Sequence, residues 1–389
     1  MPLKSDRNLV VGIYYHPEGY PPTLNAVAEL SDCFDRITII YRPNLIGTWK
    51  YPANVEAIPS GAYISSRNQE NAPVRKKISF FFNFLRLFFK SCQKHKPGLV
   101  LLYDSMALYA YHLLRPFLTF DHKVWYHNHD VVEMKELRKY SIGWFAAKAE
   151  HKAFSYISIF SLPAEDRLPF FPIDRFAGRF FFIPNYPSRR FYSRFYIPRK
   201  LATSVKIIFQ GRVGPYHGLE EIVPLLAETI ENNYELELIC KGFCAEEFRT
   251  SLLDLALRYG VKDKIRFEGL TPYNEVPRLS ATCNIGIAIF TKNDVMNLTL
   301  GTASNKIYEY AAVGLPVIYN GSEHFTRYLG KYAWALPTEV TTEDIREKIA
   351  RIIRDYDRLS AAAHQDFMQE VNFENGFAAL KSFISVNGG

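Results

Sequence analysis

Two segments in the second half of the chain combine residue types that can bind a negatively charged ligand. FQGRVGPYHGLEEIV, at 209–223, places three glycines, Arg212 and His217 where an expected strand turns into a helix. Such a turn can receive a diphosphate on free backbone amides. The segment lacks the G-x-G-x-x-G spacing, however, so a purely structural turn is an equally good interpretation.

The second segment, LTLGTASNKIYEYAAVGLPVIYN at 298–320, has the signals of a short helix that leads into a strand. Ser304 can cap the helix, Gly314 can end it and Pro316 opens the strand. Glu309 lies inside this helix among mostly apolar neighbours. A solvated carboxylate is the default interpretation, but these neighbours favour a carboxylate that reaches a polar ligand such as a ribose diol.

In the first half, KVWYHNHDVVE ends an expected strand with His127, Asn128, His129 and Asp130. Two His residues and an Asp suggest a metal site. His residues separated by one residue on a strand face the same side, however, and no third ligand is assured. A hydrogen-bonded structural role therefore ranks slightly ahead of metal binding.

The elements that position these segments are short apolar strands alternating with longer stretches of helical period. This pattern is typical of parallel sheets covered on both faces by helices. The expected strands are NLVVGIYY, RITIIYR, GLVLLYD, KVWYHN, YISIFS and RFFFIPN in the first half, and VKIIFQG, LELICKG, KIRFEGL, NIGIAIF, PVIYN and YAWALP in the second. In such sheets ligands bind at the carboxyl ends of strands, where the segments above lie. The sequence predicts an α/β protein with two doubly wound domains.

A length of 389 residues agrees with two domains. NYPSRRFYSRFYIPRK, at 185–200, combines Pro, Arg and aromatic residues without a clear period and is interpreted as the connection. We predict an N-terminal domain over 1–190, a linker over 191–202 and a C-terminal domain over 203–370. A last helix over 371–389 could pack back on the N-terminal domain.

The net charge of +7 is unevenly distributed. Residues 1–200 contain 28 Lys and Arg against 16 Asp and Glu, whereas the remainder contains 19 against 24. The basic half suits an anionic lipid, a lipid-linked phosphate or nucleic acid. Nucleic acid ranks last because the aromatic residues lie in apolar runs, and no nucleic-acid partner is expected.

Cysteine usage and the N-terminus bear on the compartment. The five cysteines include no CxxC pair, and the N-terminus lacks a signal-peptide pattern. No run reaches the roughly 20 apolar residues that span a bilayer. We therefore expect a cytoplasmic protein that can attach to the inner face of the cytoplasmic membrane.

One expected helix is both aromatic and basic. RKKISFFFNFLRLFFKSCQKHK, at 75–96, contains seven Lys and Arg and no acid, and its polar residues fall in one narrow stripe. The helix can simply cover the first sheet. Contact with an anionic membrane surface is given equal weight, because Lys and Arg lie along the stripe and at both ends. The residues expected at the membrane are Lys76, Phe81, Phe82, Arg86, Phe88, Phe89 and Lys90.

The second half resembles the C-terminal domain of the family-4, or group 1, glycosyltransferases. The resemblance rests on GR at 211–212, FEGLTPYNEVPRLSATCNIGIAIF at 267–290 and SNKIYEYAAVGLPVI at 304–318, in this order and spacing. PNYP at 184–187 also resembles the family pattern. The match covers 203–375 and implies the GT-B fold, in which two Rossmann-like domains face each other across a cleft.

The resemblance implies roles for individual residues of the second half. Glu309 would hydrogen-bond the ribose of a nucleotide sugar, and Arg212 would neutralise its diphosphate. Backbone amides around Ser304, Asn305 and Lys306 would receive the diphosphate oxygens. The implied donor-site residues are Gly211, Arg212, His217, Gly269, Leu270, Ser304, Asn305, Lys306 and Glu309.

Two further implications concern the first half. His129 matches the position from which the family's acceptor domain contacts the donor sugar, so it is expected to act with Arg212 and Lys306 in catalysis. The loop HPEGYPPTLN would border the donor phosphate and the acceptor through His16 and Gly19. A simple connection between strand and helix is nearly as good an interpretation of this loop.

Two positions depart from the family pattern. Gly301 stands eight positions before Glu309, where many members have a Glu that holds the donor sugar. Members with an S-P-N-K-like block commonly lack that Glu. His217 stands where Lys or Arg is usual, and neutral imidazole is a poorer phosphate partner.

The resemblance therefore implies a hexosyl or related glycosyltransferase. It would move a sugar from a nucleotide diphosphate sugar to a hydroxyl of a glycan or lipid-linked acceptor, with retention at the anomeric carbon. Neither a cofactor nor a metal is expected, and synthesis of cell-surface polysaccharide or glycolipid is the expected context. The alternatives are a non-catalytic GT-B subunit that binds a partner transferase or a glycan, and a nucleotide-sugar epimerase of the same fold.

Overall fold

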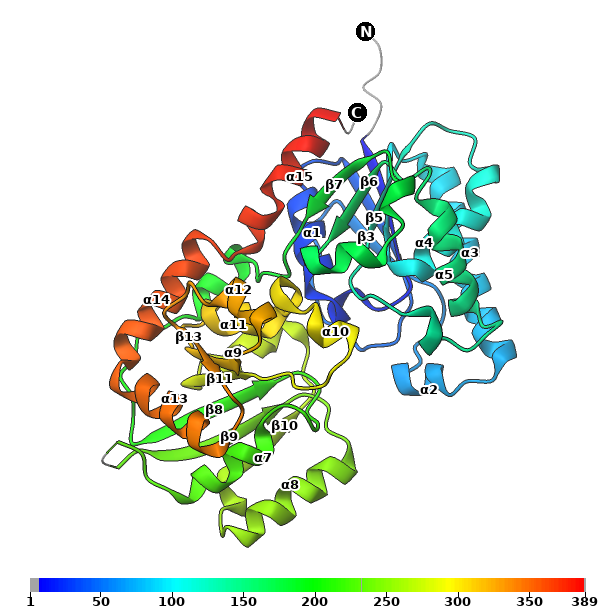
Figure 1. The fold of residues 1–389 in the computed structure, drawn as a ribbon. Helices are drawn as coiled ribbons and strands as arrows, with labels where there is room; N and C mark the ends of the chain where they lie inside the picture. The colour runs from blue at the N-terminus through cyan, green and yellow to red at the C-terminus, as the bar shows by residue number, and fades with distance from the viewer. Residues whose placement is uncertain (1–6, 232, 388–389) are drawn as a thin grey trace. The chain divides into compact units, whose positions relative to one another are not determined.

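The chain forms two compact units, each a parallel sheet covered by helices (Figure 1). The computed structural model describes residues 7–231 and 233–387. Unit 1 comprises the chain up to Asn185 together with the segment from Gly376, and unit 2 comprises Tyr186–Asn375. The predicted α/β class with two parallel sheets is confirmed.

Unit 1 contains a seven-stranded sheet in the order β3-β2-β1-β4-β5-β6-β7. Its strands are β1 (Asn8–Ile13), β2 (Arg36–Tyr41), β3 (Val55–Pro59), β4 (Leu99–Tyr103), β5 (Lys123–His127), β6 (Ile159–Leu162) and β7 (Arg179–Phe182). All were expected except β3, a short edge strand whose residues are exposed or half-buried. The order reverses between β1 and β4, and ligands of such sheets bind beyond the carboxyl ends at this point.

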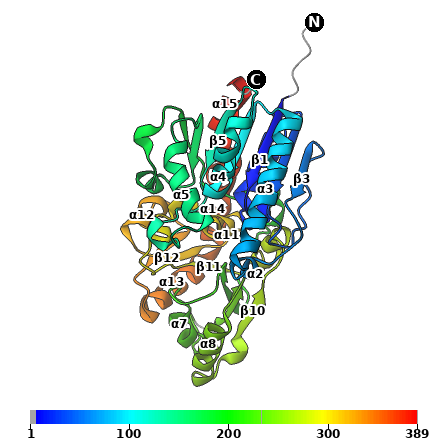
Figure 2. The ribbon, with the colours of Figure 1, turned by 90° about the vertical axis from the view of Figure 1, so that its right-hand side faces the viewer.

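Helices cover both faces of this sheet (Figures 1 and 2). They are α1 (Pro21–Leu30), α2 (Ser66–Glu70), α3 (Val74–His95), α4 (Asp104–Leu114), α5 (Ile142–Ala153) and part of α15 (Phe373–Asn387), with 3-10 turns η1 (Pro17–Gly19), η2 (Arg115–Phe117), η3 (Met134–Glu136), η4 (Glu165–Phe170) and η5 (Ile173–Arg175). α3 and α4 lie on one face, and α1 and α15 on the other. Lys381 Nζ of α15 lies 2.8 Å from Glu29 Oε2 of α1, which ties the C-terminal helix to unit 1.

Unit 2 contains a six-stranded sheet in the order β10-β9-β8-β11-β12-β13. Its strands are β8 (Ser204–Gln210), β9 (Glu235–Lys241), β10 (Ile265–Gly269), β11 (Ile285–Ala288), β12 (Val317–Asn320) and β13 (Ala335–Thr338). Each corresponds to a strand expected from the sequence. The order reverses between β8 and β11, so the segments that follow these two strands are placed to bind a ligand.

The helices of unit 2 are mostly short. They are α6 (Arg189–Tyr192), η6 (Ser193–Phe195), α7 (Leu219–Ile222), η7 (Val223–Ala227), α8 (Glu246–Arg258), η8 (Lys262–Lys264), η9 (Tyr273–Glu275), α9 (Val276–Ser280), α10 (Val295–Leu298), η10 (Gly301–Ala303), α11 (Asn305–Ala312), α12 (Glu323–Leu329), α13 (Thr342–Arg354) and α14 (Tyr356–Gln369). Tyr192 is fully buried in this unit. The first residues of the expected linker 191–202 are therefore packed into unit 2.

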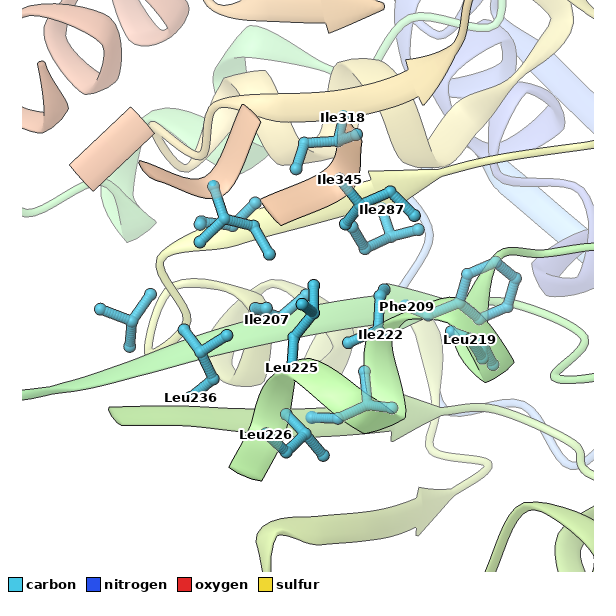
Figure 3. Close-up of a cluster of buried hydrophobic side chains, with 14 of the residues drawn as sticks. Ile207, Phe209, Leu219, Ile222, Leu225, Leu226, Leu236, Ile287, Ile318 and Ile345 are labelled. Carbon is cyan, nitrogen blue, oxygen red and sulfur yellow. The ribbon is translucent and has the colours of Figure 1, made fainter. Parts of the chain in front are cut away.

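An aliphatic core holds one face of the second sheet to its helices (Figure 3). Ile207 and Ile287 project from β8 and β11, and Ile222, Leu225 and Ile345 meet them from α7, η7 and α13. All five side chains are fully buried. Burying one such side chain contributes roughly 1.5–3 kcal/mol, so this core fixes the strands from which the loops on the ligand side start.

Gly286 allows α11 to pack closely against the other face of this sheet. A Cβ atom at Gly286 would lie 2.4 Å from Cδ2 of Tyr310, closer than two carbon atoms can approach. The ring of Tyr310 is fully buried, and its hydroxyl accepts a hydrogen bond of 2.7 Å from the amide of Gln210 at the end of β8. The glycine in β11 therefore sets how close α11 lies to the end of β8.

Replacing Gly286 by Ala should lower the midpoint of thermal unfolding by several degrees, because the Tyr310 ring or the strand must move. Overpacking of a well-packed core typically costs about 1–3 kcal/mol. The midpoint can be followed by circular dichroism. Gly214→Ala is a matched control, since a Cβ atom there meets nothing within 4 Å. Equal midpoints for the two variants would contradict this account of Gly286.

Candidate functional site

The N-terminus of α11 is the centre of the candidate site in unit 2. Ser304 is the N-cap residue, but its side chain makes no capping bond, and its buried Oγ atom has no hydrogen-bond partner among residues 7–231 and 233–387. Within the same residues, Oδ1 of Asn305 is also buried without a partner. The first amides of a helix have no partners within the helix and attract anions. The first amides of α11 and the hydroxyl of Ser304 can thus donate hydrogen bonds to a negatively charged ligand, whereas Oδ1 of Asn305 can only accept one.

Lys306 lies in the first turn of the same helix. Its Nζ atom lies 4.0 Å from the ring centre of Phe209 and 4.7 Å from that of Phe290. A Cβ atom at Gly211 would lie 3.1 Å from Nζ, so the glycine leaves room for the ammonium. Burial lowers the pKa of Lys306 to about 7, although the charge of Glu309 opposes this. A bound anion would favour the charged form and raise the pKa again.

The carboxylate of Glu309 is buried and accepts a hydrogen bond from Nε2 of Gln210. Oε1 of Gln210 in turn accepts a bond of 2.8 Å from the hydroxyl of Ser280. Burial raises the pKa of Glu309 to about 7, while the polar groups of Tyr192 and Gln210 and the charge of Lys306 lower it. Glu309 is therefore not the solvated carboxylate of the default interpretation. A ribose diol would have to share it with Gln210.

Arg212 and His217, both expected at the diphosphate, differ in exposure and in hydrogen bonding. The Arg212 side chain is exposed, and within the described part of the chain it makes no hydrogen bond or ion pair. His217 Nδ1 donates 2.8 Å to the carbonyl of Ile289. Burial, together with the charge of Lys306, lowers the pKa of His217 to about 4. Its Nδ1 is engaged within the protein, and a contact of His217 with a diphosphate stays a prediction.

The ends of β9 and β10 add one residue that sequence reasoning missed. Gly269 ends β10 with φ +63°, and Leu270, expected near the base, is 69% exposed. Lys241 ends β9, and its Nζ atom donates 2.9 Å to the carbonyl of Gly269. Burial lowers the pKa of Lys241. The available signal was a lysine before a glycine at a predicted strand end, in LELICKG.

Gly301 is packed so that no larger side chain fits. Its φ is +26°, and a Cβ atom would lie 2.8 Å from Cε2 of Tyr328 and 3.3 Å from Cε1 of His324. Its amide donates 2.9 Å to Nε2 of His324. Tyr328 and His324 of α12 therefore occupy the space that a side chain at position 301 would need. His324, like Lys241, is a polar residue near the candidate site that the sequence did not indicate.

His129 lies in unit 1, at the carboxyl end of β5, and is buried. Asp104, whose φ is +63°, accepts a bond of 2.7 Å from the amide of His129 and lies 3.1 Å from its Nδ1. Because a carboxylate accepts, Nδ1 carries a proton, and Nε2 lies at hydrogen-bond distance, 3.1 Å, from Oγ1 of Thr23. Both ring nitrogens are thus engaged within unit 1. A contact with the donor sugar stays a prediction, and it requires a ligand to displace Thr23.

The neighbours of His129 have separate partners. His127 Nδ1 lies 2.8 Å from Oγ of Ser161, and the Tyr20 hydroxyl donates 3.0 Å to Oδ2 of Asp130. In residues 7–231 and 233–387, no three His, Cys, Asp or Glu side chains gather as metal ligands would. His127 and Asp130 accordingly have hydrogen-bonded, structural positions.

The loop after β1 is a tightly packed element. Nδ1 of His16 accepts a bond of 3.3 Å from the amide of Glu18, and burial lowers the pKa of His16 to about 4. A Cβ atom at Gly19 would lie 2.4 Å from the ring of Tyr15. Glu18, which sequence reasoning missed, is buried and accepts 2.7 Å from the amide of Trp49. The contact of His16 and Gly19 with an acceptor stays a prediction.

Residues 197–366, which hold the candidate site of unit 2, match the family described as glycosyl transferases group 1. This part of the chain is similar to the group 1 glycosyl transferases. The resemblance drawn from GR, FEGL and SNKIYEYAAVGLPVI is thereby confirmed at the level of the group 1 family. Among curated protein sequences, none matches this chain significantly.

Solved structures similar to the whole chain share the architecture of both units. Sucrose-phosphate synthase from Thermosynechococcus elongatus has a TM-score of 0.68 at 13% identity, covering 97% of this chain and 98% of that one. Anabaena HepE in complex with UDP gives 0.65 at 14%, covering 98% and 100%. WaaG, described as a glycosyltransferase involved in lipopolysaccharide biosynthesis, gives 0.63 at 12%, covering 98% and 100%. These likenesses show the fold, and the predicted GT-B fold is confirmed.

Replacing Asp104 by Asn should move the proton of His129 from Nδ1 to Nε2. Asn tolerates the left-handed backbone of this position. Its single oxygen must accept from the His129 amide, so its NH2 group faces Nδ1. The tautomer can be read from the 15N shifts of the imidazole, with Asp174→Asn, an exposed Asp in the same unit, as control. An unchanged tautomer in Asp104→Asn would show that Asp104 does not set it.

Proposed function

We propose that the protein is a glycosyltransferase that moves a sugar, a hexose or a related one, from a nucleotide diphosphate sugar to an acceptor hydroxyl. One observation carries the proposal. In the part of the chain that matches the group 1 glycosyl transferases, the first amides of α11 and the buried hydroxyl of Ser304, unpaired among the described residues, lie within two turns of the buried carboxylate of Glu309. An anion-binding end and a hydroxyl-binding carboxylate on one helix suit a diphosphate joined to a ribose.

The donor would be held by groups of different chemistry. Amides at the start of α11 and the exposed Arg212 would bind the diphosphate, and Lys306 would add a charge beside it. Glu309 would accept hydrogen bonds from the ribose hydroxyls. Gly269 and Leu270 would lie near the base.

The proposed reaction proceeds with retention at the anomeric carbon and needs no protein nucleophile. The bond from the anomeric carbon to the diphosphate oxygen breaks, and a bond to the acceptor oxygen forms on the same face. The departing diphosphate oxygen takes the proton of the acceptor hydroxyl. Arg212, Lys306 and the helix amides stabilise the charge that develops on the diphosphate, which is the role a metal ion has in other transferases. We therefore propose a reaction without metal or cofactor.

The acceptor is proposed to be a glycan or a lipid-linked molecule used in cell-surface polysaccharide or glycolipid synthesis. WaaG, which shares the fold, is described as acting in lipopolysaccharide biosynthesis. HepE has been crystallised with UDP and with UDP-glucose. These relatives make uridine nucleotide sugars the first donors to test.

Arg212→Ala should abolish sugar transfer and the stabilisation of the protein by its donor, while the unfolding midpoint without ligand stays unchanged. The reason is that Arg212 is exposed and packs against nothing that the fold needs. Thermal shift with a panel of nucleotide sugars measures donor binding, and release of nucleoside diphosphate measures transfer. Arg258→Ala, an exposed arginine of α8, serves as control. Full activity in Arg212→Ala would overturn the proposed site.

A non-catalytic GT-B subunit is the second candidate, favoured by one observation. The packing of Tyr328 and His324 around Gly301 excludes the Glu with which many group 1 members hold the donor sugar. A subunit of this kind would show no transfer with any nucleotide sugar even where one stabilises it. A nucleotide-sugar epimerase would instead convert its donor without an acceptor.

The affinity for a nucleotide sugar should fall as pH rises through about 7. The free protein has a Lys306 whose pKa burial lowers to about 7, and a bound diphosphate raises that pKa. Binding is therefore strongest below pH 7, where the lysine is already charged. Above pH 7 binding must take up a proton, and each pH unit weakens it by up to about tenfold. The diphosphate of a nucleotide sugar does not titrate in this range.

Isothermal titration calorimetry in buffers of different ionisation enthalpy measures both affinity and proton uptake. Lys306→Met should bind more weakly at pH 6 and lose the fall in affinity above pH 7. A dependence that persists unchanged in Lys306→Met would assign the titration to another group.

A further inference from the structure

α3 packs against the first sheet through one side only. Phe84 and Phe88 are completely buried, and Phe81 is 8% exposed. Phe81 and Phe88 were expected at a membrane, and that expectation is wrong, because Phe81 packs against Tyr14 and Tyr109 and Phe88 packs against β1. Close approach of Phe88 is possible at Gly12 of β1, where a Cβ atom would lie 3.0 Å from its ring.

The opposite side of α3 is exposed and carries two adjoining stripes. Successive residues of an α-helix are rotated by about 100°, so Ile78, Phe82 and Phe89 share one narrow arc. Ile78 and Phe82 are 52% and 62% exposed, and Phe89 is half-buried. Arg75, Arg86 and Lys90, all exposed, lie along the adjoining arc. We call these six residues the outer face of α3, and Figure 2 shows α3 in front of the strands of unit 1.

The charge of α3 has one sign along its whole length. The segment 71–97 contains seven Lys and Arg and no acidic residue. Lys76, one of the expected membrane residues, is exposed at the margin of the outer face. A cationic surface with large apolar groups beside the charges does not suit solvent alone, since each exposed aromatic ring leaves apolar area in water.

We propose that the outer face of α3 binds the surface of an anionic phospholipid bilayer. Phe82 and Ile78 would enter the interface between headgroups and acyl chains, while Arg86 and Lys90 would pair with lipid phosphates at the same level. The described residues include no helix that is long and apolar enough to cross a bilayer, so contact is at the surface. The proposal goes beyond donor binding and does not depend on it.

Nucleic acid fits this face less well. A backbone-binding surface needs phosphate contacts, and its aromatic rings must stack on bases. The exposed apolar stripe combines Phe82 with the aliphatic Ile78, which cannot stack. The interface of a lipid bilayer can bury both the Phe82 ring and the aliphatic Ile78 side chain.

Flotation of the full-length protein with vesicles tests the proposal. Binding is expected to vesicles of phosphatidylcholine and phosphatidylglycerol, and much less to phosphatidylcholine alone. Arg86→Gln with Lys90→Gln should weaken partitioning roughly 30-fold, since each basic residue near such a surface contributes about fivefold. Ile78→Ser with Phe82→Ser should weaken it by about tenfold or more.

The controls separate loss of the surface from loss of the fold. Leu257→Ser removes a side chain that is 63% exposed on α8 of unit 2, and it should bind vesicles as the unchanged protein does. Thermal unfolding without ligand should be the same for all variants. The proposal is overturned if the full-length protein does not float with anionic vesicles, if Ile78→Ser with Phe82→Ser binds undiminished, or if a single-stranded oligonucleotide competes fully for the face. Donor-induced stabilisation is a separate readout, so failure here leaves the transferase proposal standing.

Discussion

The candidate site of unit 2 depends on how α11 is held at the end of β8. Gly286 has no side chain, so the ring of Tyr310 lies against β11 and its hydroxyl reaches the amide of Gln210. The side chain of Gln210 then bonds Glu309 on the same helix. The backbone of one strand end and the carboxylate that is proposed to bind ribose are therefore parts of one packed unit. Such preorganisation means that the site need not be rebuilt when a donor arrives.

Much of this architecture could be predicted from the sequence, because strand and helix periods are local signals. The helix capped by Ser304 and closed near Gly314 appears as α11, which ends at Ala312. β3 was missed because an edge strand buries little and has no continuous apolar run. The partner of Glu309 could not be predicted either, since Gln210 comes from another strand and its role depends on the packing of Gly286 and Tyr310.

The environment of His217 and the rotation of α3 about its own axis could not be predicted from the sequence either. His217 looks like an ordinary surface imidazole in the sequence, and only the structure shows its burial beside Lys306, which lowers its pKa, and its bond to the carbonyl of Ile289. On α3 the polar stripe correctly indicated that Arg86 and Lys90 face outward. The neighbouring Phe81 and Phe82 look equivalent in sequence, yet the contact of α3 with the sheet buries the first and exposes the second.

A crystal structure with the nucleoside diphosphate that stabilises the protein most would test the central claim most directly. The account predicts diphosphate oxygens within hydrogen-bond distance of the amides of Ser304, Asn305 and Lys306, and a ribose hydroxyl on Glu309. A nucleotide bound away from the start of α11, with Glu309 still bonded only within the protein, would contradict it.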